Sequence, residues 1–526
     1  MTKQEQEPPK NLTQTVVRGV GLAGGGYALA QVLTLAFYVV LARLASPSDF
    51  GDFAAGTILV SFGYLLSESG MLAALIHRPD RIEEAAATAT VSTAVAGLTL
   101  GLVGVAVSPL IGLIFGSDRI AEVAAVSAGL MLLHPLQVVP EALLQRRFSF
   151  LRRVIVEPIS VIVFGATAIV LCAEGMGVWG LVIATYARAV VELCLSWGFA
   201  QWRPNFSLAS FGMWRELIRY GRYGVGASAL ERGCEQVPVV LIGTFSGSAQ
   251  LGQYRYSQRI ASTPLAAIVQ GGSYVIFPAL ARITEVRERF RDASVRSLRM
   301  MATFSFPLGL ILIPLGVPIA TIVFGDVWRD AGYAAMALSL FPVAGTLVSF
   351  ASEVAKADGR PDIVARTHVV NLIAGSACML ALLTFDLVGV AAGFALGWLA
   401  AGLYSMSRIS GLLEVPRRRL YAEVLPALAA GLVMVAVLTP LEFLVLNADE
   451  QGTAAGLGLI VAEGLLGGLV YLAVLRIVAP DTICQIVELL GRLRRRGGDD
   501  HQGTPPGARD DVAVPDEMEI LDERLP

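Results

Sequence analysis

Charged side chains are scarce in this sequence of 526 residues, where Asp, Glu, Lys and Arg together make up 16%. An ordinary soluble domain has about 25%. The apolar residues reach 55% instead, and the mean hydropathy is +0.65. No compact soluble arrangement can bury that much apolar surface. The composition therefore excludes a soluble enzyme, a nucleic-acid-binding protein and a disordered scaffold, and it favours an all-α polytopic membrane protein.

Signals for cofactor chemistry are missing as well. The five cysteines show no CxxC spacing, and no histidine stands near one of them in a ligand pattern, so we expect neither a metal site nor a disulfide framework. No glycine-rich loop ends in GK[ST], which excludes ATP hydrolysis by the chain itself. The polar N-terminus, MTKQEQEPPKNLTQ, lacks the apolar run of a signal peptide. We therefore expect no catalytic residue, no cofactor and no bound metal.

Long apolar runs recur along the chain, and each is near the roughly 20 residues that cross a bilayer. Because the runs are continuous rather than alternating, they predict helices and not a transmembrane barrel. We expect about 14 transmembrane helices, at 20–43, 53–76, 86–114, 121–143, 154–173, 176–199, 221–244, 252–280, 298–324, 331–355, 365–384, 388–406, 422–446 and 453–476.

The basic residues predict the orientation of these spans. With the N-terminus inside, the inside segments hold 33 of the 40 Lys and Arg residues, and the outside loops hold only Arg119 and Arg329. Such an imbalance is the positive-inside pattern, so we expect both termini in the cytoplasm. Two basic inside segments, near 201–220 and 281–297, predict amphipathic helices on the membrane surface. The acidic tail after residue 497 is predicted to be disordered.

A weak internal repeat relates the two halves of the chain. Gly51 aligns with Gly252, and Phe53 with Tyr254, at a shift of 201 residues. Further matches pair Phe115-Gly116 with Phe324-Gly325 and Glu141 with Glu353. Six spans separate the halves, which predicts two six-helix lobes in the same orientation, related by an axis along the membrane normal. The expected domains are an N-terminal cytoplasmic segment, the two lobes, two additional helices and a cytoplasmic tail, at 1–19, 20–200, 201–410, 411–478 and 479–526.

Charges at membrane depth are costly and usually mark a cavity or a partner. The densest group combines Glu231, Arg232 and Glu235 in the seventh span with Arg255 and Arg259 in the eighth. One reading is a buried salt bridge between Glu235 and Arg259, which fall at a similar level. The other is a cationic cavity in which the arginines bind phosphate groups, since their planar fork is always charged and binds phosphate bidentately. Glu68 and Arg43 are candidates for coupling or gating.

Four stretches resemble the polysaccharide flippase branch of the multidrug/oligosaccharidyl-lipid/polysaccharide exporter superfamily, over roughly residues 16–410. They include the Arg-Leu-x-Ser-Pro turn from Arg43 to Gly51, Glu68 with Gly70, and the basic loop from Arg146 to Phe150. The stretches are LARLASPSDFGDFAAGTILVSFGYLLSESGMLAALIHR (41–78), VPEALLQRRFSFLRRVIVEPIS (139–160), GVWGLV (177–182) and LIGTFSGSAQLGQYRYSQRI (241–260).

The resemblance implies a protein of the bacterial inner membrane that moves polyprenyl-pyrophosphate-linked oligosaccharides outward for lipopolysaccharide or exopolysaccharide synthesis. The implied partners are this lipid-linked sugar and membrane lipids, with polysaccharide polymerase and export proteins as further candidates, and no nucleic acid. Two alternatives remain open. One is a multidrug or toxin exporter of the same superfamily. The other is a non-flipping component of a polysaccharide synthase complex, either an enzyme or a partner protein.

Overall fold

The structure is a computed structural model, and it describes residues 12–63, 75, 80–146, 155–281, 283–483 and 485. Most of these residues are in helices. Within those residues there is no β-strand, so the expected all-α class is confirmed. The chain divides into a large unit, residues 1–475, and a C-terminal unit, residues 476–526. The C-terminal unit is described only for the end of the last long helix and for helical residues near 480–483.

The first half of the large unit builds one group of helices. They are α1 (Leu12–Leu44), α2 (Pro47–Gly56), α4 (Ile82–Phe115), α5 (Asp118–Ser127), α6 (Leu130–Leu133), η1 (His134–Gln137), α7 (Val138–Arg146), α8 (Glu157–Ala173) and α9 (Val178–Ala200). Side-chain caps stabilise the first turns of two of these helices. Ser46 and Asp49 form a reciprocal capping box around Pro47 at the start of α2, and Ser117 caps α5.

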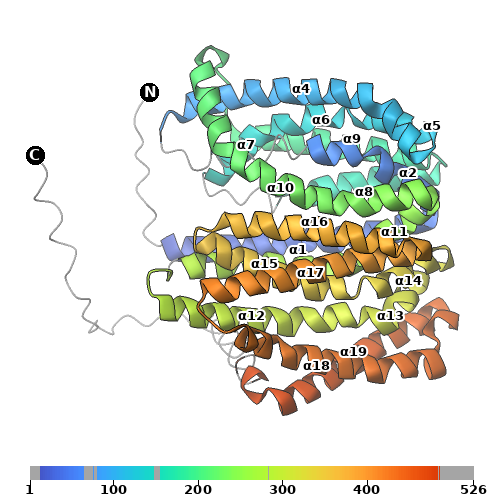
Figure 1. Cartoon of the computed structure of the whole chain (residues 1–526). Helices are drawn as coiled ribbons and strands as arrows, with labels where there is room; N and C mark the ends of the chain where they lie inside the picture. Colours follow the sequence, from blue (N-terminus) through green and yellow to red (C-terminus); the bar gives the residue numbers. More distant parts are fainter. Residues whose placement is uncertain are drawn as a thin grey trace, which may run out of the picture. The chain divides into compact units, whose positions relative to one another are not determined.

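The second half follows a short helix η3 (Phe206–Leu208). Its elements are α10 (Phe211–Phe245), α11 (Gly247–Ala281), α12 (Arg287–Leu310), α13 (Leu312–Pro318), η4 (Ile319–Phe324), η5 (Asp326–Trp328), α14 (Arg329–Ala337), α15 (Leu340–Ala357), α16 (Pro361–Ala381), η6 (Leu383–Phe385) and α17 (Asp386–Leu412). Beyond the repeat come α18 (Arg417–Leu441), η7 (Glu442–Leu446), η8 (Ala448–Glu450) and α19 (Thr453–Val478). Figure 1 shows the helices running alongside one another, with α18 and α19 adjacent to α12 and α13.

Seven described helices are long and apolar enough to cross a membrane, and two bent helix pairs raise the number to nine. Two shorter apolar helices, Leu29–Leu44 and Glu157–Ala173, add further membrane-depth segments among the described residues. The chain is therefore a multi-pass membrane protein. The order of elements is consistent with fourteen spans, and that count remains an expectation.

Both bent pairs break where proline removes a backbone donor. The pair α12–α13 bends by 43° and the pair α14–α15 by 48°. Pro314 and Pro342 follow these breaks by a few residues, and neither can donate to the carbonyl four residues earlier. Pro307 and Pro314 flank the first bend.

The internal repeat is visible in a reciprocal glycine contact between the halves. Gly51 of α2 lies against the backbone of Ser248, and Gly252 of α11 lies against the backbone of Pro47. A Cβ atom on either glycine would overlap the opposing carbonyl, so each position requires glycine for close approach. The aligned residues Gly116 and Gly325 also match, because both follow a helix end with positive φ, +64° and +112°. These matches support the predicted parallel repeat, and the bounds of its two lobes and of the two added helices stay predictions.

The two basic amphipathic segments are not separate surface helices. The second half of the first segment, from Phe211, is the start of α10 and continues into the span, and Met213 and Leu217 pack in a buried cluster with Val138 and Ala85. In the second, helix α12 begins at Arg287 and runs into the span, with Phe290 and other apolar side chains buried. A helix that extends past the bilayer satisfies its backbone hydrogen bonds internally, so no boundary is needed where the apolar pattern changes.

Candidate functional site

Two cavities lie between the lobes and share Tyr38, Phe53 and Arg259 among their lining residues. The first, here called the inter-lobe cavity, has a volume of about 240 Å³ and is formed by α1, α2 and α11. The second, the first-lobe cavity, has a volume of about 310 Å³ and extends between α1, α8 and α9. Their shared residues make them neighbouring parts of one central space.

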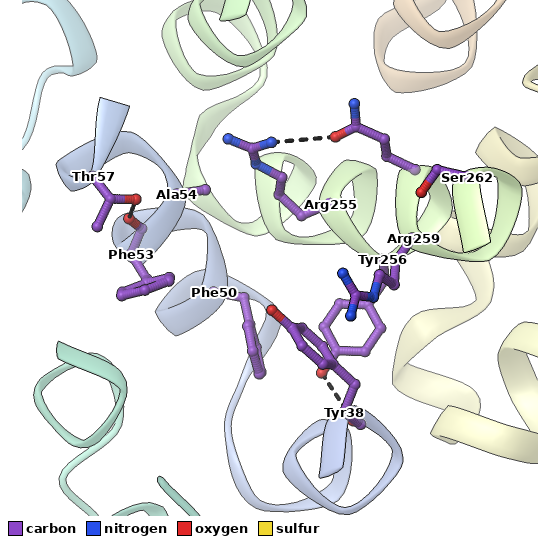
Figure 2. Close-up of a pocket in the computed structure, with 10 residues that line it drawn as sticks. Tyr38, Phe50, Phe53, Ala54, Thr57, Arg255, Tyr256, Arg259 and Ser262 are labelled. Atoms are coloured by element: carbon purple, nitrogen blue, oxygen red, sulfur yellow. Dashed lines mark hydrogen bonds between the residues drawn. The ribbon is translucent and has the colours of Figure 1, made fainter. Parts of the chain in front are cut away.

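Helix α11 places two of the predicted arginines on this space. Arg255 and Arg259 are one helical turn apart and both line the inter-lobe cavity, facing the α2 residues Phe53 and Ala54. Figure 2 shows α2 on one side of the space and the two arginines with Ser262 on the other. The i, i+4 spacing seen in the sequence therefore does put both side chains on the cavity face.

Neither arginine forms an ion pair with a carboxylate among the described residues. Arg255 donates to Gln258 Oε1 at 3.2 Å. The guanidinium of Arg259 lies 4.8 Å from the ring centre of Tyr38, and its buried Nε has no hydrogen-bond partner in the described part of the chain. A cation–π contact satisfies a guanidinium only partly, because its N–H groups still lack acceptors. These two cations are available to an anionic ligand.

The seventh-span residues do not line either cavity, although the Glu235 carboxylate interacts electrostatically with Arg255. Arg232 of α10 pairs with Glu235 at 3.4 Å, and the Arg232 side chain is 46% exposed. Glu231 is exposed too. Within the described residues no ion pair links Glu235 to Arg259, so the salt bridge considered from the sequence is absent and Glu235 has its own partner on the same helix. The structure thus brings together Arg255 and Arg259 but not the whole predicted group.

A third arginine at this space was not assigned to it from the sequence. Arg188 of α9 lines the first-lobe cavity with Glu157 and Gln31. Its Nε also donates to Glu192 at 2.9 Å, and Glu192 accepts a second hydrogen bond from Ser160. The i, i+4 spacing of Arg188 and Glu192 does predict their pairing. The spacing of residues within one helix does not show that the Arg188 side chain also lines a cavity between helices.

One end of the inter-lobe cavity is closed by contacts that cross from one lobe to the other. Trp328 Nε1 donates to the Ala42 carbonyl at 2.9 Å, and the Tyr256 hydroxyl donates to the Tyr38 carbonyl at 3.2 Å. At this end the ring of Phe50 packs edge-to-face against the rings of Tyr256 and Trp328, which are tilted against each other. It is the arginine-poor end of the bundle, where α1 ends and α2 begins.

Arg43 belongs to the same closure, whereas Glu68 lies outside the described residues. Arg43 donates from α1 to the Ile322 carbonyl of η4 at 3.2 Å. Close by, Arg119 bridges Asp49 at 2.8 Å and Asp52 at 3.4 Å, and Ser248 of the second lobe donates to Asp52. Burial alone would raise the pKa of the Asp49 carboxyl. The hydrogen bonds from Ser46 and Arg119 outweigh it and hold that pKa below its ordinary value.

Helices from both halves of the chain surround a central space that holds Arg255 and Arg259, and this architecture is that of a membrane transporter. A family model described as "Polysaccharide biosynthesis protein" matches residues 40–333. Since that is more than half of the chain, the chain belongs to this family of polysaccharide biosynthesis proteins. The resemblance noted from the sequence motifs is confirmed.

Named relatives and solved structures agree with this placement. The succinoglycan biosynthesis transport protein ExoT of Rhizobium meliloti is 26% identical over 326 residues, which are 60% of this chain and 64% of that protein. The chain thus matches less than two thirds of that relative's length. The fold is similar to the lipid II flippase MurJ in an inward closed conformation, with a TM-score of 0.72 and 15% identity over 88% of this chain and 99% of that one. It is also similar to an inward-facing multidrug transporter of the MOP superfamily, with a TM-score of 0.58 and 17% identity over 73% and 96%.

Proposed function

We propose that the protein moves polyprenyl-pyrophosphate-linked oligosaccharide units across the bacterial inner membrane for lipopolysaccharide or exopolysaccharide synthesis. The observation that carries the proposal is the central space with Arg255 and Arg259 on α11, because both cations lack a carboxylate partner in the described residues. A pyrophosphate group provides the missing acceptors and the compensating charge. Membership in a polysaccharide biosynthesis family supports the sugar-linked nature of the substrate.

Alternating access around this space is the proposed mechanism. The cross-lobe contacts at the arginine-poor end close it toward one side, which in the proposed orientation is the periplasm. Opening requires the pairs Trp328–Ala42, Tyr256–Tyr38 and Arg43–Ile322 to separate while the lobes move as units. Arg188 and Gln31 lie deeper in the first lobe and extend the polar lining for the sugar, and Glu231, Arg232 and Glu235 form a charged approach on α10. Glu68 remains a candidate for coupling.

The test is translocation of a fluorescent polyprenyl-pyrophosphate oligosaccharide in proteoliposomes. We compare wild type with Arg255→Ala/Arg259→Ala, and with Arg366→Ala as the control, since Arg366 is an exposed arginine on α16. We expect wild type and the control to translocate and the double variant to lose at least tenfold in rate. Losing even one charge-assisted hydrogen bond costs about 1.5–3 kcal/mol, and 1.4 kcal/mol is a factor of ten.

Two other results would contradict parts of the proposal. If the double variant translocates as fast as wild type, the protein is a flippase, but Arg255 and Arg259 stabilise the structure and do not bind the substrate. No translocation by folded wild-type protein, together with efflux of a cationic drug, would favour the multidrug exporter to which the fold is also similar.

A further inference from the structure

A pair of glutamates is buried in the helical hairpin that follows the repeat. Glu442 begins η7 at the end of α18, and Glu463 lies eleven residues into α19. They are 2% and 1% exposed. Glu442 precedes the turn between the helices and Glu463 follows it, and the two carboxyl groups meet across the hairpin. Their side chains interact with each other.

Little in the described surroundings satisfies these carboxyl groups. Glu442 Oε1 accepts the Ala448 backbone N–H at 2.9 Å. Glu442 Oε2 and both oxygens of Glu463 are buried without a hydrogen-bond partner among the described residues, and so is the hydroxyl of Thr439, one helical turn before Glu442. Several buried oxygens without a hydrogen-bond partner indicate a ligand that donates a hydrogen bond to them.

No basic side chain neutralises the pair within the described part of the chain. Helices α13 and η4 pack close to the hairpin end, and their sequences, LIPLGVP and IATIVF, contain no ionisable residue. Besides Glu463, the carboxylate of Asp449 interacts electrostatically with Glu442. Asp449 itself forms an ion pair with Arg329 at 2.7 Å. Arg329 also has Asp326 at 3.8 Å. Two buried carboxylates without a counter-ion cannot both stay charged, because each lacks hydration and repels the other.

We propose that Glu442 and Glu463 form a proton-binding site, in which the pair shares one proton at neutral pH. The proton converts one carboxylate into a donor for the other, which removes the repulsion and satisfies an oxygen in the same step. The site lies in the added helices rather than at the central space, so the inference stands independently of the substrate.

The site is placed to link protonation to the closed end of the transporter. Glu442 accepts a hydrogen bond from the backbone N–H of Ala448, in the short helix η8. Asp449 of the same helix forms an ion pair with Arg329 of α14. On α19, Gly456 packs against Ile322, whose carbonyl also accepts the hydrogen bond from Arg43. Loss of the proton leaves a second negative charge buried in the hairpin that carries these contacts. We therefore expect deprotonation to loosen residues 442–456 from the second lobe.

The experiment measures the protonated carboxyl band of the full-length protein in lipid nanodiscs by infrared difference spectroscopy during a pH titration. The variants are Glu442→Gln, Glu463→Gln and the double variant, each close to the native side chain in size. Glu450→Gln is the control, because Glu450 is exposed in the same turn. We expect a band at pH 7 in wild type and control that disappears at higher pH. The double variant should lack it, and each single variant should titrate at lower pH because the new amide donates to the remaining carboxylate.

A second readout is hydrogen–deuterium exchange of residues 442–456. Exchange should rise with pH in wild type and be independent of pH in the double variant, which mimics the protonated pair. An unchanged band in the folded double variant would overturn the proton site, and equal pH dependence of exchange in both proteins would overturn the link to the hairpin. If sodium in place of choline removes the band at pH 7, the pair binds a metal cation, and the proposal is wrong.

Discussion

At the scale of single residues, the partners of a charged side chain matter more than its position along the chain. Arg232 and Arg259 both occur in apolar spans, yet Arg232 pairs with Glu235 on its own helix and is half exposed. Arg259 instead lies over Tyr38 beside a cavity, with a buried Nε that has no partner in the described residues. Only the second arrangement leaves a cation available for a ligand.

Asp49 provides a prediction about pH at this scale. Its pKa is below the ordinary value of 3.8, because the hydrogen bonds from Ser46 and Arg119 outweigh the effect of burial. The stabilisation is therefore fully present above about pH 4 and is lost as the pH falls through the lower folded-state pKa. Asp49→Asn removes the charge and the N3 carboxylate of the capping box, and should cost about 1 kcal/mol at pH 7.

The measurement is thermal unfolding of both proteins in detergent at several pH values. The difference between wild type and Asp49→Asn should shrink as the pH falls below about 4 and through the lowered pKa of the native Asp49 carboxyl, because that carboxyl then becomes protonated. Asp326→Asn is the control, since that side chain is 84% exposed and lies 3.8 Å from Arg329. A pH-independent difference for Asp49→Asn would show that the charge contributes nothing.

At the scale of elements, the closest contact between the halves is made by α2 and α11. Gly51 and Gly252 let the two helix starts touch through their backbones, and the aromatic cluster of Phe50, Tyr256 and Trp328 packs beside them. The repeat places equivalent glycines on equivalent helices, so each half contributes the same surface to the contact. A pseudo-symmetric contact of this kind can separate and re-form as a unit.

Adding one methyl group should prevent this contact from closing. Gly51→Ala places a Cβ atom on the Ser248 carbonyl, and overpacking of a tight interface typically costs about 1–3 kcal/mol. We expect the arginine-poor end to open, which spin labels on α2 and α11 would report as a longer distance by pulsed electron paramagnetic resonance. Gly198→Ala is the matched control, because Gly198 is also helical and has open space around its Cβ position.

An unchanged distance distribution in Gly51→Ala would mean that the backbone adjusts locally. The contact would then not be the closing element. Gly252→Ala gives an independent check, since its Cβ would meet the Pro47 carbonyl on the other side of the pseudo-twofold contact.

At the scale of the whole molecule, the distribution of basic residues predicts the orientation. Of the 40 Lys and Arg residues, 33 fall in segments that are expected in the cytoplasm. Loops rich in these residues are retained on the cytoplasmic side when the protein inserts into the membrane. A green fluorescent protein fused after residue 526 should fluoresce, and alkaline phosphatase at that point should be inactive. Phosphatase inserted after Gly175, in a predicted outside turn, should be active. Phosphatase activity at the C-terminus would reverse the proposed orientation.

Much of the fold could be predicted from the sequence because membrane helices are defined locally. Apolar length and composition alone indicated an all-α multi-pass protein. Matches in the same order in both halves, Gly51 with Gly252 and Gly116 with Gly325, indicated the repeat that the contact of Gly51 and Gly252 makes visible. The predictions failed where a helix continues past the membrane. The segments near 201–220 and 281–297 were predicted to be separate amphipathic helices. The hydropathy pattern does not reveal that the backbone hydrogen bonds of α10, from Phe211, and of α12, from Arg287, continue uninterrupted into the spans.

The amino-acid sequence by itself determined the class of protein, the approximate spans, the repeat and the family, since each depends on hydrophobicity, charge or motifs along one stretch of chain. The tertiary structure alone decided which charges share a place. Arg188 and Arg259 are 71 positions apart and line one cavity, and Glu442 meets Glu463 across a hairpin. Helices that are packed on several sides can each turn a different face to a cavity. Only their mutual packing determines which face that is.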